Sequence, residues 1–205
     1  MRKQLITALM LIGISTSVNA DFDKGVAAYT GNDIPLALIE FKSAAELGDP
    51  RAQFNLGLMH EQGIGTEQSF EKALIWYKKS GELGNMFAQY NAGVFYENGK
   101  GTKVDFAQAN DWYRKAVLQG DGLAAGNLGM LYIRADGVVE NKEAGLALLI
   151  MSTTLDSSPE NIAKRNISMI RNLTPDMVAA AQELSNQMID TQTPLIVLDK
   201  YLAKR

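Results

Sequence analysis

Hydrophobic residues recur along the chain at the spacing of amphipathic helices. Ala52, Leu56, Met59 and His60 fall at i, i+4, i+7 and i+8. A few positions further on, Phe70 begins a second pattern at i, i+3, i+4 and i+7. Residues at these spacings lie on one face of an α-helix. The pattern therefore predicts two consecutive helices, each with one buried face.

This pair of helices recurs with a period of 36 residues. The repeated positions include a Gly-Asp or Gly-Asn step, an alanine, an asparagine and a glycine inside the first helix, and a Trp-Tyr step in the second. We predict repeats over 48–83 and 84–119, and a degenerate repeat over 120–155. The recurring sets are Gly48, Gly84 and Gly120; Ala52, Ala88 and Ala124; Asn55, Asn91 and Asn127; Gly57, Gly93 and Gly129; and Trp76-Tyr77 with Trp112-Tyr113.

The third repeat departs from this pattern. Leu148-Leu149 stands where the Trp-Tyr step belongs, and Gly145 replaces an alanine. We expect this repeat to pack differently, with its apolar 146–151 run covered by the residues that follow.

Residues on both sides of the repeats are expected to cap them, because each unit can bury its apolar face only against a neighbour. Upstream, 21–47 is interpreted as a capping helix pair. Downstream, 156–189 is expected to hold two closing helices, over 159–172 and 175–189, each begun by a Ser/Thr-Pro-acid signal. The pattern leaves open whether the tail, 190–205, is ordered.

Two features of the repeats predict close packing. Gly57, Gly93 and Gly129 lie inside helices, where glycine costs about 1 kcal/mol relative to alanine. We attribute them to close approach of the paired helix. Trp76 and Trp112 are expected to wedge between neighbouring helix pairs as core residues.

The order Ala-x-x-x-Leu-Gly, then Gly-x-Gly, then Ala-x-x-Trp-Tyr resembles the Sel1-like repeat, a variant of the tetratricopeptide repeat. The resemblance implies an all-α, α/α solenoid in which antiparallel helix pairs form a right-handed superhelix. It also implies a non-catalytic adaptor that binds a partner protein or peptide on its concave face. An alternative is an envelope enzyme or a cell-wall or polysaccharide-associated factor, since some disulfide-rich relatives are credited with binding β-lactams. The absence of cysteine separates this chain from them.

The N-terminus has the layout of a secretory signal peptide. Arg2 and Lys3 precede an apolar stretch of about ten residues, and the segment ends at Val18-Asn19-Ala20. We predict that 1–20 is removed after Ala20 and that the mature protein is periplasmic or secreted.

Charge narrows the classes of partner. Removing Arg2 and Lys3 leaves 18 basic and 23 acidic side chains, a net charge of −5. An acidic chain without a basic run is not expected to bind nucleic acid or to insert into a membrane after cleavage. We expect a monomeric scaffold whose partner is an unidentified protein or peptide.

The sequence indicates no catalytic, metal or cofactor site. His60 is the only histidine and there is no cysteine, so a zinc site with nitrogen or sulfur ligands cannot be assembled. His60 stands where Tyr96 and Tyr132 stand in the other repeats, which favours a packing role.

Binding residues are predicted on the first helix of each repeat, which lines the concave face in tetratricopeptide-like solenoids. An apolar strip flanked by amides suits an extended or helical peptide. The alternative is that the asparagines only bond neighbouring backbone, or that other helices bury the strip. The candidates are Phe54, Asn55, Leu58, Tyr90, Asn91, Val94, Asn127 and Met130.

Overall fold

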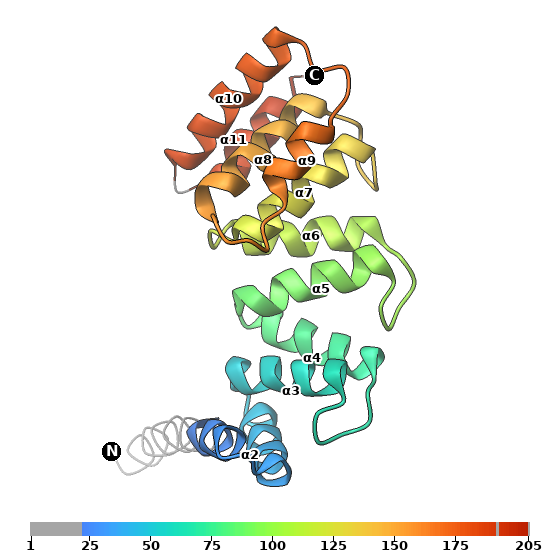
Figure 1. Cartoon of the computed structure of the whole chain (residues 1–205), viewed down its shortest axis with the longest axis vertical. Coiled ribbons are helices and arrows are strands. Elements are labelled where there is room, and N and C mark those ends of the chain that lie inside the picture. The colour runs from blue at the N-terminus through green and yellow to red at the C-terminus, as the bar shows by residue number, and fades with distance from the viewer. Residues whose placement is uncertain (1–21, 192, 205) are drawn as a thin grey trace, which may run out of the picture. The chain divides into compact units, whose positions relative to one another are not determined.

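The computed structural model describes residues 22–191 and 193–204, and every regular element among them is a helix, which confirms the all-α prediction. The predicted signal peptide and its cleavage site lie outside the described residues. The helices are one over 22–30, then α2 (Ile34–Glu46), α3 (Pro50–Gln62), α4 (Phe70–Glu82), α5 (Met86–Asn98), α6 (Phe106–Val117), α7 (Gly122–Arg134), α8 (Lys142–Leu155), α9 (Ala163–Met169), α10 (Pro175–Ile189) and α11 (Pro194–Leu202) (Figure 1).

Backbone contacts divide the chain into two compact units, Met1–Ala88 and Gln89–Arg205. We call them the N-terminal unit and the C-terminal unit. The N-terminal unit contains the helices from 22 to 82 and the start of α5, and the C-terminal unit contains the rest.

Helices begin at the polar residues that the repeats share. The Asp49 carboxylate accepts hydrogen bonds from the Arg51 and Ala52 amides at the start of α3. Asp121 does the same for Ala124 at the start of α7. These caps satisfy amide groups that have no partner inside the helix, and they explain why the Gly-Asp step recurs.

The core of the N-terminal unit lies between the helix 22–30, α2 and α3. It is built from small residues around Phe41, Leu56 and Met59, with Phe22 and Trp76 packed against it. Alanine is the most frequent residue in this core, which lets the helices approach closely.

Gly57 and Gly93 lie under aromatic rings of the paired helix, which confirms the predicted close approach. A Cβ atom added to Gly57 would lie 2.5 Å from the Tyr77 ring, and one added to Gly93 would lie 2.5 Å from the Tyr113 ring. The ring packs on the glycine, and its burial offsets the low helix propensity of that residue.

The third repeat packs differently, as expected. A Cβ added to Gly129 or to Gly145 would lie 2.7 Å from the carbonyl oxygen of the other glycine, so α7 and α8 meet backbone to backbone. Leu148 and Leu149 take the place of the Trp-Tyr step and are fully buried. The helices α9, α10 and α11 all contact α8, which confirms that its apolar run is covered.

The predicted helix over 159–172 is wrong in its bounds, because α9 spans only Ala163–Met169. The side chain of Asn161 explains the late start. Its Nδ2 donates to the carbonyl oxygens of Ser152 and Asp156, and its Oδ1 accepts from the Ala163 amide. These bonds hold 156–161 as a loop against the end of α8. The second closing helix, α10, begins after Thr174 as predicted.

Within the tail, Pro194–Leu202 forms the helix α11. Leu195 and Leu198 are buried, and the Arg114 guanidinium on α6 donates two hydrogen bonds to Asp199, at 2.8 and 2.6 Å. The Tyr201 hydroxyl donates to Glu143 at the start of α8. The tail therefore folds back onto the second and third repeats.

The two tryptophans differ in burial, although the sequence predicts the same role for both. Trp112 is 4% exposed, whereas Trp76 is half-buried. A lysine lies over each ring, Lys115 at 3.9 Å from the Trp112 centroid and Lys79 at 4.4 Å from that of Trp76. The prediction of a core position is confirmed for Trp112, whereas Trp76 packs against the core with part of its side chain exposed. The two rings have different surroundings, because α11 contacts α6, the helix that carries Trp112.

Candidate functional site

Each of the first three helix pairs contains one aromatic pair that joins its two helices. Phe22 packs against Phe41 with ring centroids 5.8 Å apart, and Phe54 packs against Tyr77 at 5.9 Å. Tyr90 and Tyr113 form the third pair at 6.1 Å. In both predicted site residues, Phe54 and Tyr90, part of the ring is therefore covered by a contact within the fold.

In the C-terminal unit, hydrogen bonds connect the aromatic pair to a charged network. The buried Tyr113 hydroxyl donates to Glu97 Oε2 at 2.6 Å and accepts from Asn127 Nδ2 at 3.1 Å. Arg134 donates to the other Glu97 oxygen at 2.7 Å and pairs with Asp136 at 2.8 Å. The amide of Asn127 therefore bonds a tyrosine hydroxyl, which differs from the bond to neighbouring backbone considered as an alternative.

This network depends on a neutral phenol. Burial, followed by the nearby Glu97 carboxylate, raises the pKa of Tyr113 far above its ordinary value. In the N-terminal unit, the Tyr77 hydroxyl donates to Glu61 at 2.6 Å, and burial raises the pKa of Tyr77 in the same way. Each tyrosine hydroxyl is held as a donor by a carboxylate 16 residues earlier, at the end of the first helix of the pair.

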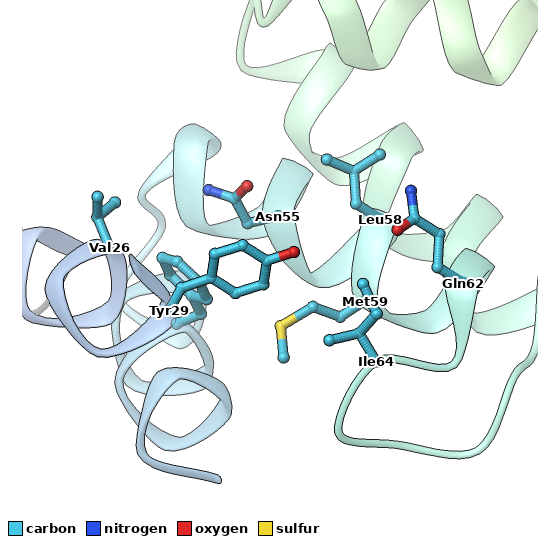
Figure 2. Close-up of a pocket in the computed structure, with 8 residues that line it drawn as sticks. Val26, Tyr29, Asn55, Leu58, Met59, Gln62 and Ile64 are labelled. Carbon is cyan, nitrogen blue, oxygen red and sulfur yellow. The ribbon is translucent and has the colours of Figure 1, made fainter. Parts of the chain in front are cut away.

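The N-terminal unit also contains a pocket of about 260 Å³. It lies between the helix 22–30, α2, α3 and the start of the following loop (Figure 2). None of its lining residues carries a formal charge, and most are apolar. They are Val26, Tyr29, Phe41, Asn55, Leu58, Met59, Gln62 and Ile64.

Two of the predicted site residues, Asn55 and Leu58, line this pocket. Phe54 lies beside Phe87, whose ring is 59% exposed, at 6.0 Å between centroids. The other predicted residues belong to the C-terminal unit, where Tyr90 and Asn127 both join the Tyr113 network. All eight are half-buried: Phe54, Asn55, Leu58, Tyr90, Asn91, Val94, Asn127 and Met130.

The sequence reasoning missed a second pocket, of about 560 Å³, in the C-terminal unit. It is lined by Tyr132, the loop over 138–141 and Leu202 of α11. The helical tail forms one wall, and the sequence did not indicate whether that tail was ordered.

His60 is half-buried on α3. Burial, followed by the charge of Lys72, lowers the pKa of His60, so the ring is neutral at pH 7.

Among residues 22–191 and 193–204, no group of three or more histidine or acidic side chains is placed to hold a metal ion. A search of the same residues found no helix with the length and hydropathy of a membrane span.

Comparisons with known proteins agree with the helix pairs described above. Among solved structures, the chain is similar to a Sel1 repeat protein from Oxalobacter formigenes, with 28% sequence identity and a TM-score of 0.64 over 73% of this chain and 58% of that chain. It is also similar to a protective antigen of uropathogenic Escherichia coli with an SLR fold, with 25% identity and a TM-score of 0.67 over 83% of this chain and 38% of that chain. The chain thus spans less than two thirds of either relative. A comparison with curated proteins found no match.

The sequence signature of the Sel1 repeat matches residues 50–85, 87–121 and 122–157. These segments make up about half of the chain and contain α3 to α8. Both of these structural relatives are helical-repeat solenoids of the same kind. The chain therefore belongs to the Sel1 repeat family.

Proposed function

We propose that this protein is a non-catalytic interaction module of the cell envelope that binds a peptide segment of a partner protein along the first helices of its repeats. The observation that carries the proposal is the neutral pocket beside α3. Sel1 repeat proteins generally mediate protein–protein interactions and generally act as non-catalytic scaffolds, which supports the same reading.

The surface around the pocket has the composition of a peptide-binding surface. Phe54 and Leu58 present half-buried apolar groups, Phe87 presents an exposed ring, and Asn55 supplies an amide. Aromatic anchors in partly desolvated sites carry most of the affinity in such interfaces. Their rings are already held by neighbouring rings, so little side-chain entropy is lost when a partner binds.

Selection of peptides on the purified protein, followed by calorimetric titration, tests the proposal. Phe54→Ala and Tyr90→Ala are expected to weaken binding of a selected peptide by about 1 to 2 kcal/mol while the helical content is unchanged. Ile39→Ala, at a 63% exposed position on α2, serves as a matched control that leaves binding unchanged.

A different result would refute the assignment. If both variants fold and bind normally while Lys78→Glu on α4 abolishes binding, the partner binds the second helices instead. If the protein turns over nitrocefin and loses that turnover in a pocket variant, the non-catalytic part of the proposal is wrong.

Export is part of the proposal and rests on the Val18-Asn19-Ala20 segment. Terminal sequencing of protein from the envelope fraction is expected to begin at Asp21. Recovery of the chain from the cytoplasm with Met1 intact would contradict the assigned compartment.

A further inference from the structure

The pocket of the N-terminal unit occupies the position that the charged network fills in the C-terminal unit. Gly25 packs under Phe41 as Gly93 packs under Tyr113, which fixes the register of the two helix pairs. In that register, each of the eight lining residues has one counterpart. The pairs are Val26 with Val94, Tyr29 with Glu97, Phe41 with Tyr113, Asn55 with Asn127, Leu58 with Met130, Met59 with Leu131, Gln62 with Arg134, and Ile64 with Asp136.

At four of these positions, the N-terminal unit lacks the group that forms the network. Tyr29 stands in the place of Glu97, Gln62 in the place of Arg134, and Ile64 in the place of Asp136. Phe41 also lacks the hydroxyl through which Tyr113 joins the network. All three charges and the central hydroxyl are therefore absent from the N-terminal position, while the apolar positions and the asparagine are retained.

The substitutions leave a space with mixed but uncharged chemistry. Asn127 donates to the Tyr113 hydroxyl, whereas Asn55 stands opposite a phenylalanine and lines the pocket instead. Figure 2 shows the Asn55 amide, the Tyr29 ring and the Met59 side chain around the same space, with Gln62 beyond them. The walls offer aliphatic and aromatic carbon, one thioether, one phenol and two amides.

We propose that this pocket is an anchor site for one uncharged aromatic side chain of a partner peptide, a proposal that rests on the function proposed above. A volume of about 260 Å³ exceeds the roughly 150 Å³ of an engineered cavity that holds benzene, so an aromatic ring fits with room for its linkage. The thioether of Met59 makes favourable contacts with a ring edge.

The polar groups at the same site suit the peptide backbone next to the anchor. Each primary amide of Asn55 and Gln62 offers a donor and an acceptor, which is the complement of a peptide group. A charged side chain would lose its hydration without finding a counter-charge among the lining residues. The pocket therefore selects an aromatic residue over lysine or glutamate.

The test compares three small probes on the full protein: N-acetyl-tryptophanamide, N-acetyl-leucinamide and N-acetyl-lysinamide. Binding is followed by the NMR shift of the Met59 methyl group, labelled with ¹³C and assigned with Met59→Leu. The tryptophan probe is expected to shift the methyl signal saturably, with an affinity at least threefold higher than that of the leucine probe. The lysine probe is expected to cause no saturable shift.

Two variants complete the test, one that copies the C-terminal unit and one neutral control. The fourfold variant Tyr29→Glu, Phe41→Tyr, Gln62→Arg and Ile64→Asp rebuilds the charged network, in a combination that the fold already accommodates at 97, 113, 134 and 136. This variant is expected to lose at least tenfold in affinity for the tryptophan probe. Ile39→Ala, at a 63% exposed position on α2 that does not line the pocket, is the neutral control and is expected to bind as the wild type does.

Several results would overturn the proposal. Equal binding of the tryptophan and leucine probes would refute the aromatic selectivity, and undiminished binding by the folded four-residue variant would refute the location. Selected peptides that depend on Tyr90 but leave the Met59 signal unshifted would overturn the anchor site and leave the proposed function standing. Failure of any selected peptide to bind would overturn the proposed function itself.

Discussion

Replacing Tyr113 with phenylalanine removes the hydroxyl at the centre of the C-terminal network and nothing else. The ring keeps its contacts with Gly93 and Tyr90, so no cavity forms. The loss is the 2.6 Å hydrogen bond to Glu97 and the 3.1 Å bond from Asn127. Phe41 shows that the fold accepts a phenylalanine at this place in a helix pair.

The expected loss of stability follows from the two partners of the Tyr113 hydroxyl, Glu97 and Asn127. A hydrogen bond to a charged group contributes about 1.5 to 3 kcal/mol. Glu97 keeps its bond with Arg134, and Asn127 is half-buried and can reach water, so neither group is left buried and unpaired. We therefore expect the free energy of unfolding to fall by about 2 kcal/mol, near the lower part of that range.

Urea unfolding followed by circular dichroism measures this change, which corresponds to a midpoint shift of about 1 M for an m-value near 2 kcal/mol/M. Tyr29→Phe, at a 43% exposed position, is the matched control and should change stability by less than about 0.5 kcal/mol. A double-mutant cycle with Glu97→Gln isolates the coupling between the two side chains. A loss below about 0.5 kcal/mol for Tyr113→Phe, or no coupling in the cycle, would refute the reasoning.

Three further changes have expected outcomes that urea unfolding can check. Trp112→Ala should cost roughly 3 to 5 kcal/mol because the ring is buried, and Trp76→Ala should cost less than half as much; equal losses would contradict the difference in burial. Ala135→Gly should stabilise the protein by about 1 kcal/mol, since Ala135 ends α7 with a left-handed backbone, φ 60°, and a destabilised variant would show that this conformation carries no strain. The native state holds the pKa values of Tyr77 and Tyr113 above the unfolded value of about 10. The contribution of these two groups to stability should therefore be constant below pH 10, and stability should fall as the pH rises above it. The double Phe variant should flatten that fall, and an unchanged slope above pH 10 would refute the assignment.

The repeats could be predicted because their determinants are local and periodic. Gly57 and Tyr77 lie 20 residues apart, and the same pair recurs at Gly93 and Tyr113, so the sequence alone indicates a close helix contact. The burial of Trp112 could not be predicted in this way. It accompanies the return of α11 from more than 80 residues further along the chain, for which no periodic signal exists.

The residues that form the pocket can be recognised in the sequence, but not when the repeats are aligned with a constant period of 36 residues. The first helix pair has a shorter turn, so Gly25 precedes Gly57 by 32 residues while Phe41 precedes Tyr77 by 36. Only with that shift does Tyr29 align with Glu61 and Glu97. The start of α9 carries no such signal, because the bonds of Asn161 to the end of α8 are made in the folded state.

The packing of α11 against α6 and α8 changes how this chain can unfold. In an open array each repeat touches only its neighbours, so helices can peel away one after another from a free end. Here the bond between Arg114 and Asp199 closes a loop across 85 positions of sequence that contains the whole third repeat, α9 and α10. A pull on the C-terminus, or a protease working inward from it, meets α11 first. Until that helix is detached, the third repeat, α9 and α10 must unfold together as one cooperative unit.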